Sequence, residues 1–526
     1  MVSKGVRLVR GGGLLPVAAL LLLARGAAAQ AQPGKAPAAP VAPAAPNARP
    51  ATPAPGASSP PGAQATNAAA NAPVIDTGVS DAQKVQAIQD LKDRLHVASP
   101  GQGLTSDEAA RRAMQTNATV EAKKKALEGA QIGIDAANAA YWPQLKLSAS
   151  YTRLSPVTLN FGGVGSFSLP TDQISFDAGV QVPISDYVFK VSHGVAAASR
   201  QRDAAAYDRN ATFASVARDA RVAYYTWIRQ QTQVVIQEQA VEQAQGHQRD
   251  TQNSFAAGLA SKADVLKSQS DLANAMLQLE TARNNTATAA AQLDVAMGIP
   301  PGQEPHFIGE EVFVEAPELA SLPTADAGLR EAMEKRAELK TLDANAAASR
   351  EQAKSTRVGN YPRLDASAAA NYSKPNQRYF VDTKFHDTWQ AGVVLSWTPT
   401  AIPLNDATAS QAEVKATELA AQRRAAVDGM KVEIEQALRS AATARYSIGV
   451  ATIQLTSAEE GLRVRTELFR AGRGTNVELT DAETTLTNAR IQLADAYVSA
   501  RIALVQLNHA LGRDAAPPAS GSTAEQ

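Results

Sequence analysis

The sequence contains no cysteine among its 526 residues, and its 51 basic and 51 acidic residues cancel. The absence of cysteine excludes disulfides, thiolate metal ligands and a lipid attached to an N-terminal cysteine, so packing alone must stabilise the fold. The balanced charge provides no basic surface of the kind that binds nucleic acid. These absences exclude a disulfide-stabilised scaffold and a nucleic-acid-binding protein.

The sequence also lacks the residue patterns of an active site. None of its six histidines stands in a metal-ligand spacing with a pair of carboxylates. Glycines 11–13 lie in a predicted signal peptide, and glycines 162, 163 and 165 lie between two predicted strands, so neither group forms a nucleotide-binding loop. We therefore predict no enzymatic activity, no catalytic residue, no cofactor and no metal site. The histidines are His96, His193, His247, His306, His386 and His509.

The N-terminus has the layout of a secretory signal peptide. Basic residues precede an apolar run at 14–24, and small residues follow at 27–31. We predict a signal peptide at residues 1–29, with cleavage after Ala29 or Ala31. The alternative, an uncleaved membrane anchor, is disfavoured because the apolar run is short for a membrane-spanning helix. Cleavage removes four basic residues and no acid, which leaves a mature net charge of about −4.

Residues 30–79 are rich in alanine, proline, glycine and serine and have no periodic apolar face. Such a segment buries too little surface to offset its chain entropy, so we predict a disordered tether. The tail at residues 514–526 has a similar composition, and we predict that it is disordered as well.

The remaining chain contains an internal duplication. FAAGLASKADVLKSQSDLANA at 255–275 matches FRAGRGTNVELTDAETTLTNA at 469–489 without gaps, and the constant offset of 214 continues to Gly298 and Gly512. We predict a first repeat at 80–300, a connector at 301–328 and a second repeat at 329–513. Each repeat reads as helix, strand, strand, long helix, helix. The first helical stretches run to about Tyr141 and Gly359.

The helices carry heptads with an unusual second seam. In the last helix, leucine or alanine recurs every seven residues along one line of core positions, called a seam here, and alanine recurs along a second seam three residues later. Because alanine side chains are small, two helices can pack closely. The first repeat has a similar pattern. The segment from Val191 to Phe255 would span about 100 Å as one helix. This pattern predicts long antiparallel coiled-coil hairpins. The two seams of the last helix are Leu479, Leu486, Leu493, Ala500 and Leu507, and Ala482, Ala489, Ala496, Ala503 and Ala510.

Four segments alternate between apolar and polar residues. They lie near 143–153, 172–183, 362–373 and 388–398, and aromatic residues gather at their ends. A length of about nine residues, one apolar face and an aromatic girdle are typical of outer membrane strands. The alternative is a half-buried soluble sheet. Four strands do not close a soluble core, and open edges cannot face lipid, so the pattern predicts an oligomer. Three chains would supply twelve strands.

These features together resemble the TolC family of bacterial outer membrane efflux proteins, over residues 80–513. The resemblance implies a mixed, mainly α fold: a homotrimer with a twelve-stranded β-barrel in outer membrane lipid, continuous with an α-helical periplasmic tunnel. It implies that the chain resides in the outer membrane of a Gram-negative bacterium and extends into the periplasm. The motifs that carry it are Ala257–Ser261 and Ala471–Thr475, Tyr-Trp-Pro at 141–143 and Tyr-Pro at 361–362, and LDVAMG at 293–298 with LNHALG at 507–512.

The resemblance also implies an acidic ring at the periplasmic entrance. The matching positions are Glu478 and Asp481, where the family usually has aspartate at the position of Glu478. Like charges from three chains around a narrow pore would attract cations. The alternative is that both are ordinary solvated charges on a coiled coil.

Two further sets of residues match family features at the hairpin tips. Gly258, Leu259, Ser261, Gly472 and Thr475 match positions that receive a periplasmic adaptor protein. The alternative for the glycines is simple helix termination, which does not exclude docking. Arg463, Arg465, Arg470 and Arg473 are candidates for a latch that holds the entrance shut, although surface arginines on helices are usually just solvated.

The resulting hypothesis is a passive exit duct of a tripartite efflux or type I secretion system. Its partners would be a periplasmic adaptor, also called a membrane fusion protein, and a proton-driven or ATP-driven inner membrane pump. A soluble periplasmic coiled-coil scaffold is the alternative, and it would not need membrane-length strands. No residue pattern indicates the exported substrate or the class of pump.

Overall fold

The computed structural model describes residues 103–160, 162–163, 165–302, 306–376, 378–379 and 383–514. All of them belong to the compact unit Thr66–Gln526. The predicted signal peptide, the tether and the tail beyond Asp514 lie outside the described residues. None of the described helices is both long and apolar enough to cross a membrane.

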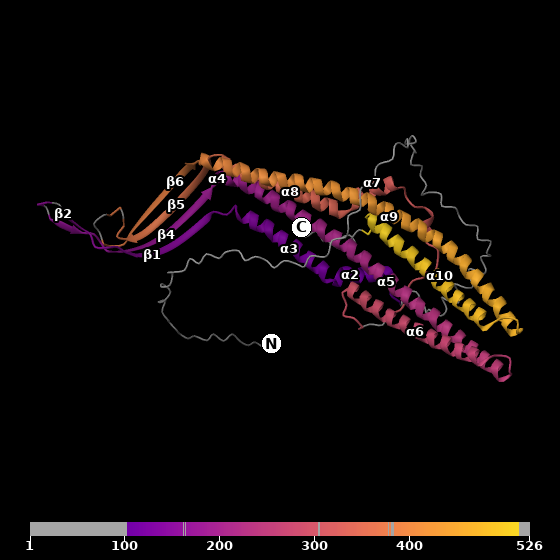
Figure 1. Ribbon diagram of the computed structural model, residues 1–526. Helices are drawn as coiled ribbons and strands as arrows, with labels where there is room; N and C mark the ends of the chain where they lie inside the picture. Colours follow the sequence, from indigo (N-terminus) through magenta and orange to yellow (C-terminus); the bar gives the residue numbers. More distant parts are fainter. Residues whose placement is uncertain are drawn as a thin grey trace, which may run out of the picture. The chain divides into compact units, whose positions relative to one another are not determined.

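Two copies of one arrangement make up the described chain, which confirms the predicted duplication and fold class (Figure 1). In each copy two short helices lead into two strands, a long helix follows, and a final helix runs back along it. The first copy comprises α2 (Ser106–Thr116), α3 (Ala118–Ala139), β1 (Gln144–Arg153), β4 (Asp172–Pro183), α5 (Ser192–Ala256) and α6 (Lys262–Met297). The second comprises α7 (Ala325–Lys335), α8 (Ala337–Arg357), β5 (Arg363–Lys374), β6 (His386–Ser396), α9 (Ile402–Arg470) and α10 (Asn476–Ala510).

Short elements connect these parts. A two-stranded hairpin of β2 and β3 extends from the β1–β4 connection, and the glycines predicted to lie in a loop are at its turn. This hairpin was not predicted from the sequence. The short elements are β2 (Thr158–Asn160), β3 (Ser166–Ser168), α4 (Ile184–Asp186), the π-helical η1 (Tyr187–Val191), and the 3₁₀ turns η2 (Pro317–Ala320), η3 (Val358–Asn360) and η4 (Pro399–Ala401).

The first helical stretch of each repeat is broken, where the sequence predicted one continuous helix. The break at Asn117 ends α2 and starts α3, because the Asn117 side chain accepts a hydrogen bond from the N–H of Thr119. Gly298, which follows α6 with a positive φ of 73°, lies against this break, and a Cβ there would meet the carbonyl carbon of Thr116 at 2.8 Å. Gly512 lies against the equivalent break at Arg336, where a Cβ would meet side-chain atoms of Lys335 and Arg336 at 3.1 Å. Gly298 therefore allows two backbones to approach closely, and Gly512 leaves space for side chains at the second break.

The four long strands form one antiparallel sheet in the order β1-β4-β5-β6. Its register places the apolar residues of all four strands on one face, as the row Leu147, Ala178, Ala370 and Trp389 illustrates. Leu147 is 71% exposed and Trp389 is 75% exposed. The amphipathic strands of the prediction are thus confirmed, and their apolar face is uncovered in the single chain.

The opposite face of the sheet is polar. The row next to the apolar one contains Ser148, Asp177, Asn371 and Thr388. Asn371 donates a hydrogen bond of 2.6 Å to Asp177 across β4 and β5. Since β1 and β6 each pair with one neighbour only, both edges of the sheet are open.

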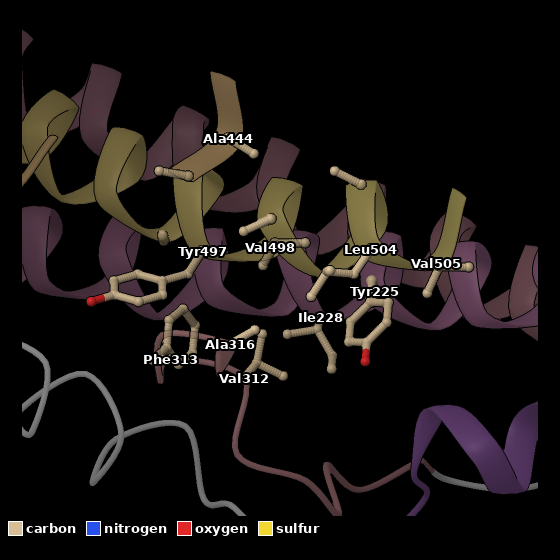
Figure 2. Close-up of a cluster of buried hydrophobic side chains, with 14 of the residues drawn as sticks. Tyr225, Ile228, Val312, Phe313, Ala316, Ala444, Tyr497, Val498, Leu504 and Val505 are labelled. Atoms are coloured by element: carbon tan, nitrogen blue, oxygen red, sulfur yellow. The ribbon is translucent and has the colours of Figure 1, made fainter. Parts of the chain in front are cut away.

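The core lies where the two repeats meet. Tyr225 and Ile228 of α5 belong to the same buried cluster as residues of α10 and the connector, and Figure 2 shows the connector residue Val312 beside Ile228 and Phe313 beside Tyr497. The ring of Phe313 packs edge-on against Tyr497 at 6.0 Å between centroids. The connector therefore helps to close the core, as well as linking the repeats.

The predicted heptad seam is buried along α10, where Leu479, Leu486, Leu493, Ala500 and Leu507 are all in the core. The matching seam of α6 is less closed, since Leu272 and Leu279 are only half-buried. The difference follows from packing: α10 contacts both α9 and α5, whereas α6 mainly contacts α5. One side of α6, which includes Met276 and Leu277, is left exposed.

Replacing the buried Ala496 of the second seam with leucine should destabilise the protein by about 1–3 kcal/mol, because the added methylenes have no space between closely packed helices. The free energy of unfolding in denaturant, measured on detergent-solubilised protein, tests this. Thr484→Ala on the exposed side of α10 is the control and should change it by less than about 0.5 kcal/mol. Equal effects of the two changes would contradict a tight alanine seam.

Candidate functional site

The tips of the two hairpins are built by the same local geometry. At the α5–α6 turn, Gly258 has a φ of 75° and its N–H donates to the carbonyl of Phe255 at 3.0 Å. At the α9–α10 turn, Gly472 has a φ of 70° and its N–H donates to the carbonyl of Phe469 at 2.9 Å. Glycine adopts this left-handed conformation without the steric cost of a Cβ, so both glycines terminate their helices.

Each turn is followed by a capping box. Ser261 caps α6 by accepting from the N–H of Asp264 at 3.1 Å, and the Asp264 carboxylate accepts from the N–H of Ser261 at 2.9 Å. Hydrogen bonds from Ser261 hold the pKa of Asp264 below its usual range. Thr475 and Glu478 form the equivalent box on α10, with both hydrogen bonds at 3.3 Å. The sequence assigned Ser261, Thr475 and Glu478 to docking or to the ring, and the structure gives each of them a capping role.

Leu259 differs from the other predicted docking residues because its side chain is uncovered, although its backbone N–H donates to the carbonyl of Ser254 at 2.8 Å and helps to close the turn. It is 84% exposed at the α5–α6 turn. An exposed leucine next to a rigid glycine turn is an apolar group that a partner can cover. The adaptor-docking assignment stays a prediction, and Leu259 is its strongest member.

The two acidic residues of the predicted ring lie on the first turns of α10. Glu478 forms an ion pair with Arg465 of α9, with Nη1 and Oε2 3.2 Å apart. Asp481 is exposed, and among the described residues it has no ion pair within 4 Å. Of the two, Asp481 therefore has the carboxylate that is more available to a passing cation. The ring itself stays a prediction because it needs three chains.

The four arginines of the predicted latch differ in their contacts. Arg463 pairs within its own helix with Glu460 at 2.7 Å and with Glu467 at 3.5 Å. Arg465 joins α9 to α10 through Glu478. For Arg470 and Arg473, the described part of the chain contains no ion pair. A latch between chains stays a prediction, and Arg470 and Arg473 are the members whose charge is not used within the described chain.

A buried polar cluster behind the tips was not predicted. His247 of α5 is buried against α10, where it forms a hydrogen bond with Asn476 and lies 3.9 Å from Glu483. Burial, with a smaller effect from Asp271, raises the pKa of Glu483 to about 7. The sequence did contain one indication that Glu483 is buried, because it directly follows Ala482, a core position of the heptad. Most residues around it are polar, so this indication was overlooked.

Gly472→Ala should destabilise the α9–α10 turn by about 1 kcal/mol, because alanine disfavours the left-handed conformation. Gly461→Ala, inside the C-terminal part of α9 with open space around it, is the matched control and should stabilise by about 0.5–1 kcal/mol. Denaturant unfolding of the solubilised protein reports both values. Changes of the same sign would show that the turn does not require a left-handed residue.

Comparison with known proteins assigns the chain to a family. A sequence profile of the outer membrane efflux protein family matches residues 109–299 and 328–513, one match in each repeat. A search of curated proteins gives no match. The profile covers well over half of the 526 residues.

Several solved structures with the same fold are outer membrane proteins. VceC from Vibrio cholerae has 20% identity and a TM-score of 0.63, over 77% of this chain and 96% of that one. The CmeC outer membrane channel from Campylobacter jejuni has 14% identity and a TM-score of 0.63, over 80% and 90%. The MtrE outer membrane channel from Neisseria gonorrhoeae, solved in an open state, has 15% identity and a TM-score of 0.62, over 77% and 88%. The duplicated helical hairpins, the amphipathic sheet and the profile match agree: the chain belongs to the outer membrane efflux protein family, and it resides in the outer membrane and extends into the periplasm.

Proposed function

We propose that three copies of this chain close a twelve-stranded barrel in the outer membrane, with their hairpins forming a tunnel in the periplasm. The observation that carries the proposal is the four-stranded sheet, which has an uncovered apolar face and open edges at β1 and β6. Unpaired backbone groups cannot face lipid, so the edges require strands from other copies. The exposed side of α6 provides a second surface for a neighbouring copy.

The trimer would act as the passive exit duct of a tripartite efflux or type I secretion system. A periplasmic adaptor would dock at the hairpin tips, and a proton-driven or ATP-driven inner membrane pump would supply the energy. The family is one of channels, which supports a role without catalysis. Membership of an outer membrane family also favours the duct over a soluble periplasmic scaffold.

Cation selectivity of the duct should depend more on Asp481 than on Glu478, because Arg465 and the capping box engage the Glu478 carboxylate. In planar bilayers under a salt gradient, Asp481→Asn should lower the cation-to-anion permeability ratio more than Glu478→Gln does. The double variant should bring the ratio close to one.

The control for this measurement is Asp428→Asn, which removes an exposed carboxylate from α9 far along the chain from the tip. It should leave the ratio unchanged. Reproducible channels with unaltered selectivity in the double variant would move the filter elsewhere. A soluble monomer that needs no detergent would overturn the duct itself.

Docking at the tips can be tested by photo-crosslinking. A photoreactive amino acid in place of Leu259 should cross-link to a periplasmic adaptor in intact cells, because this side chain is exposed at the α5–α6 turn. The same amino acid in place of Ile132, which is exposed on α3, is the control. Mass spectrometry identifies the product. Equal cross-linking to the adaptor from both positions would contradict docking at the tip.

A further inference from the structure

The buried cluster behind the tips joins the hairpin α5–α6 to the hairpin α9–α10. His247 of α5 and Asn476 of α10 are both buried, and the ring Nε2 is hydrogen-bonded to the Asn476 Oδ1. The Asn476 Nδ2 donates to the carbonyl of Asp264, at the start of α6, at 3.5 Å. This polar network therefore connects three helices from both repeats close to the tips.

The network assigns the hydrogen atoms of His247. Because the Asn476 amide donates to Asp264, its oxygen faces His247 and accepts, so the ring Nε2 carries a hydrogen. In the neutral ring the Nδ1 then has a free lone pair, and it lies 3.9 Å from the Oε1 of Glu483. These two atoms are too far apart for a hydrogen bond, so the Glu483 carboxyl is uncharged only while it carries its own proton.

The surroundings of Glu483 contain a second acid. Asp271 of α6 faces it, and one oxygen of Asp271 pairs with Lys267 while the other is buried without a hydrogen-bond partner among the described residues. From α9, the ring of Phe469 packs on His247 at 5.6 Å.

None of the other charged groups at this end of α9 and α10 forms an ion pair with Glu483 in the described chain, and Asp481, Arg470 and Arg473 have no ion pair there at all. Arg463 is paired along α9, and Arg465 is paired with Glu478. Within 4 Å of Glu483, His247 is the one side chain in the described chain that can carry a positive charge. Loss of the Glu483 proton would therefore leave two half-buried carboxylates facing each other, with one cation, Lys267, paired to Asp271.

We propose that the proton on the Glu483 carboxyl holds the α9–α10 hairpin against the α5–α6 hairpin, so that the tips separate as the pH rises. Only the consequence for conduction, a wider entrance at higher pH, rests on the proposed function. The docking step is a property of the two hairpins.

The direction of the pH dependence follows from the difference in the pKa of Glu483 between the docked and the separated hairpins. Burial raises the pKa of Glu483 to about 7 in the docked state, from an ordinary value of 4.5 for an exposed carboxyl. Docking is therefore favoured most below about pH 4.5, weakens as the pH rises, and reaches its minimum above about pH 7. A shift of this size corresponds to a change in the docking equilibrium on the order of a hundredfold.

The absence of cysteine from the chain makes a distance measurement direct. Nitroxide labels at Ala257→Cys and Ala471→Cys, which are exposed and equivalent positions of the two turns, report the separation of the tips by pulsed electron resonance. Labelled chains are diluted with unlabelled ones, so that distances within one chain dominate. Between pH 5 and 8.5 we expect a longer-distance population to grow, and Glu483→Gln should remain docked throughout.

Two further variants complete the test. Asp271→Asn removes the facing charge and should reduce the pH dependence. Glu280→Gln removes an α6 carboxylate that is 62% exposed and should respond like the parent protein. A tip separation that is independent of pH, or a Glu483→Gln variant that responds like the parent, would overturn the proposal.

Single-channel currents with the pH varied on the tip side separate this proposal from the duct. If the tips respond to pH as expected but no channel forms, the docking switch stands and the duct fails. If channels form while the tip distances ignore pH, the duct stands and the switch is overturned. If both respond and Glu483→Gln abolishes both responses, both are supported.

Discussion

The unpaired edges of β1 and β6 constrain the rest of the structure. A sheet that exposes an apolar face must bury it, and a sheet edge in lipid must be paired. Neither requirement is met by the four strands of a single chain. Each pair of strands continues into a long helix. Pairing of the open strand edges with strands of other copies therefore also brings the helical hairpins of those copies together. The uncovered side of α6 is consistent with this requirement, because it lies on the hairpin that follows the first strand pair.

The duplication gives two hairpins with the same turns and caps but with different surroundings. Gly258 and Gly472 have nearly the same φ, and both turns are followed by a capping box. Away from the tip the copies diverge: the position equivalent to His247 is Gly461, and the position equivalent to Glu483 is Gln269. Backbone geometry has thus been retained in both copies, whereas the polar cluster exists once, between them.

The cluster of His247, Asn476 and Glu483 therefore lies at the contact between the repeats. There, a change in the charge of Glu483 acts on the docking of the two hairpins and leaves the helices themselves intact. Buried polar groups stabilise a contact only while all of them are satisfied. An orphan oxygen of Asp271 and a carboxyl with a raised pKa make this contact conditional, in contrast to the alanine seam, whose packing does not respond to pH. The hairpins therefore combine a permanent contact along their length with a titratable one near their tips.

The sequence by itself determined the long helices, the four long strands and their order, because these depend on local periodicity. The heptads at 479–507 continue over several turns of one helix, and apolar and polar residues alternate throughout 174–182. The matched glycines 258 and 472 mark the two hairpin turns. The break at Asn117 was missed because an asparagine can cap a helix, as Asn117 does, or lie inside one, as Asn210 of α5 does, and the contact with Gly298 exists only in the folded chain. Glu478 was assigned to an acidic ring from its position, although its oxygens also cap α10 and contact Arg465. The tertiary structure alone decided that His247, Asn476 and Glu483 meet, since residues far apart in sequence are brought together only when two hairpins pack.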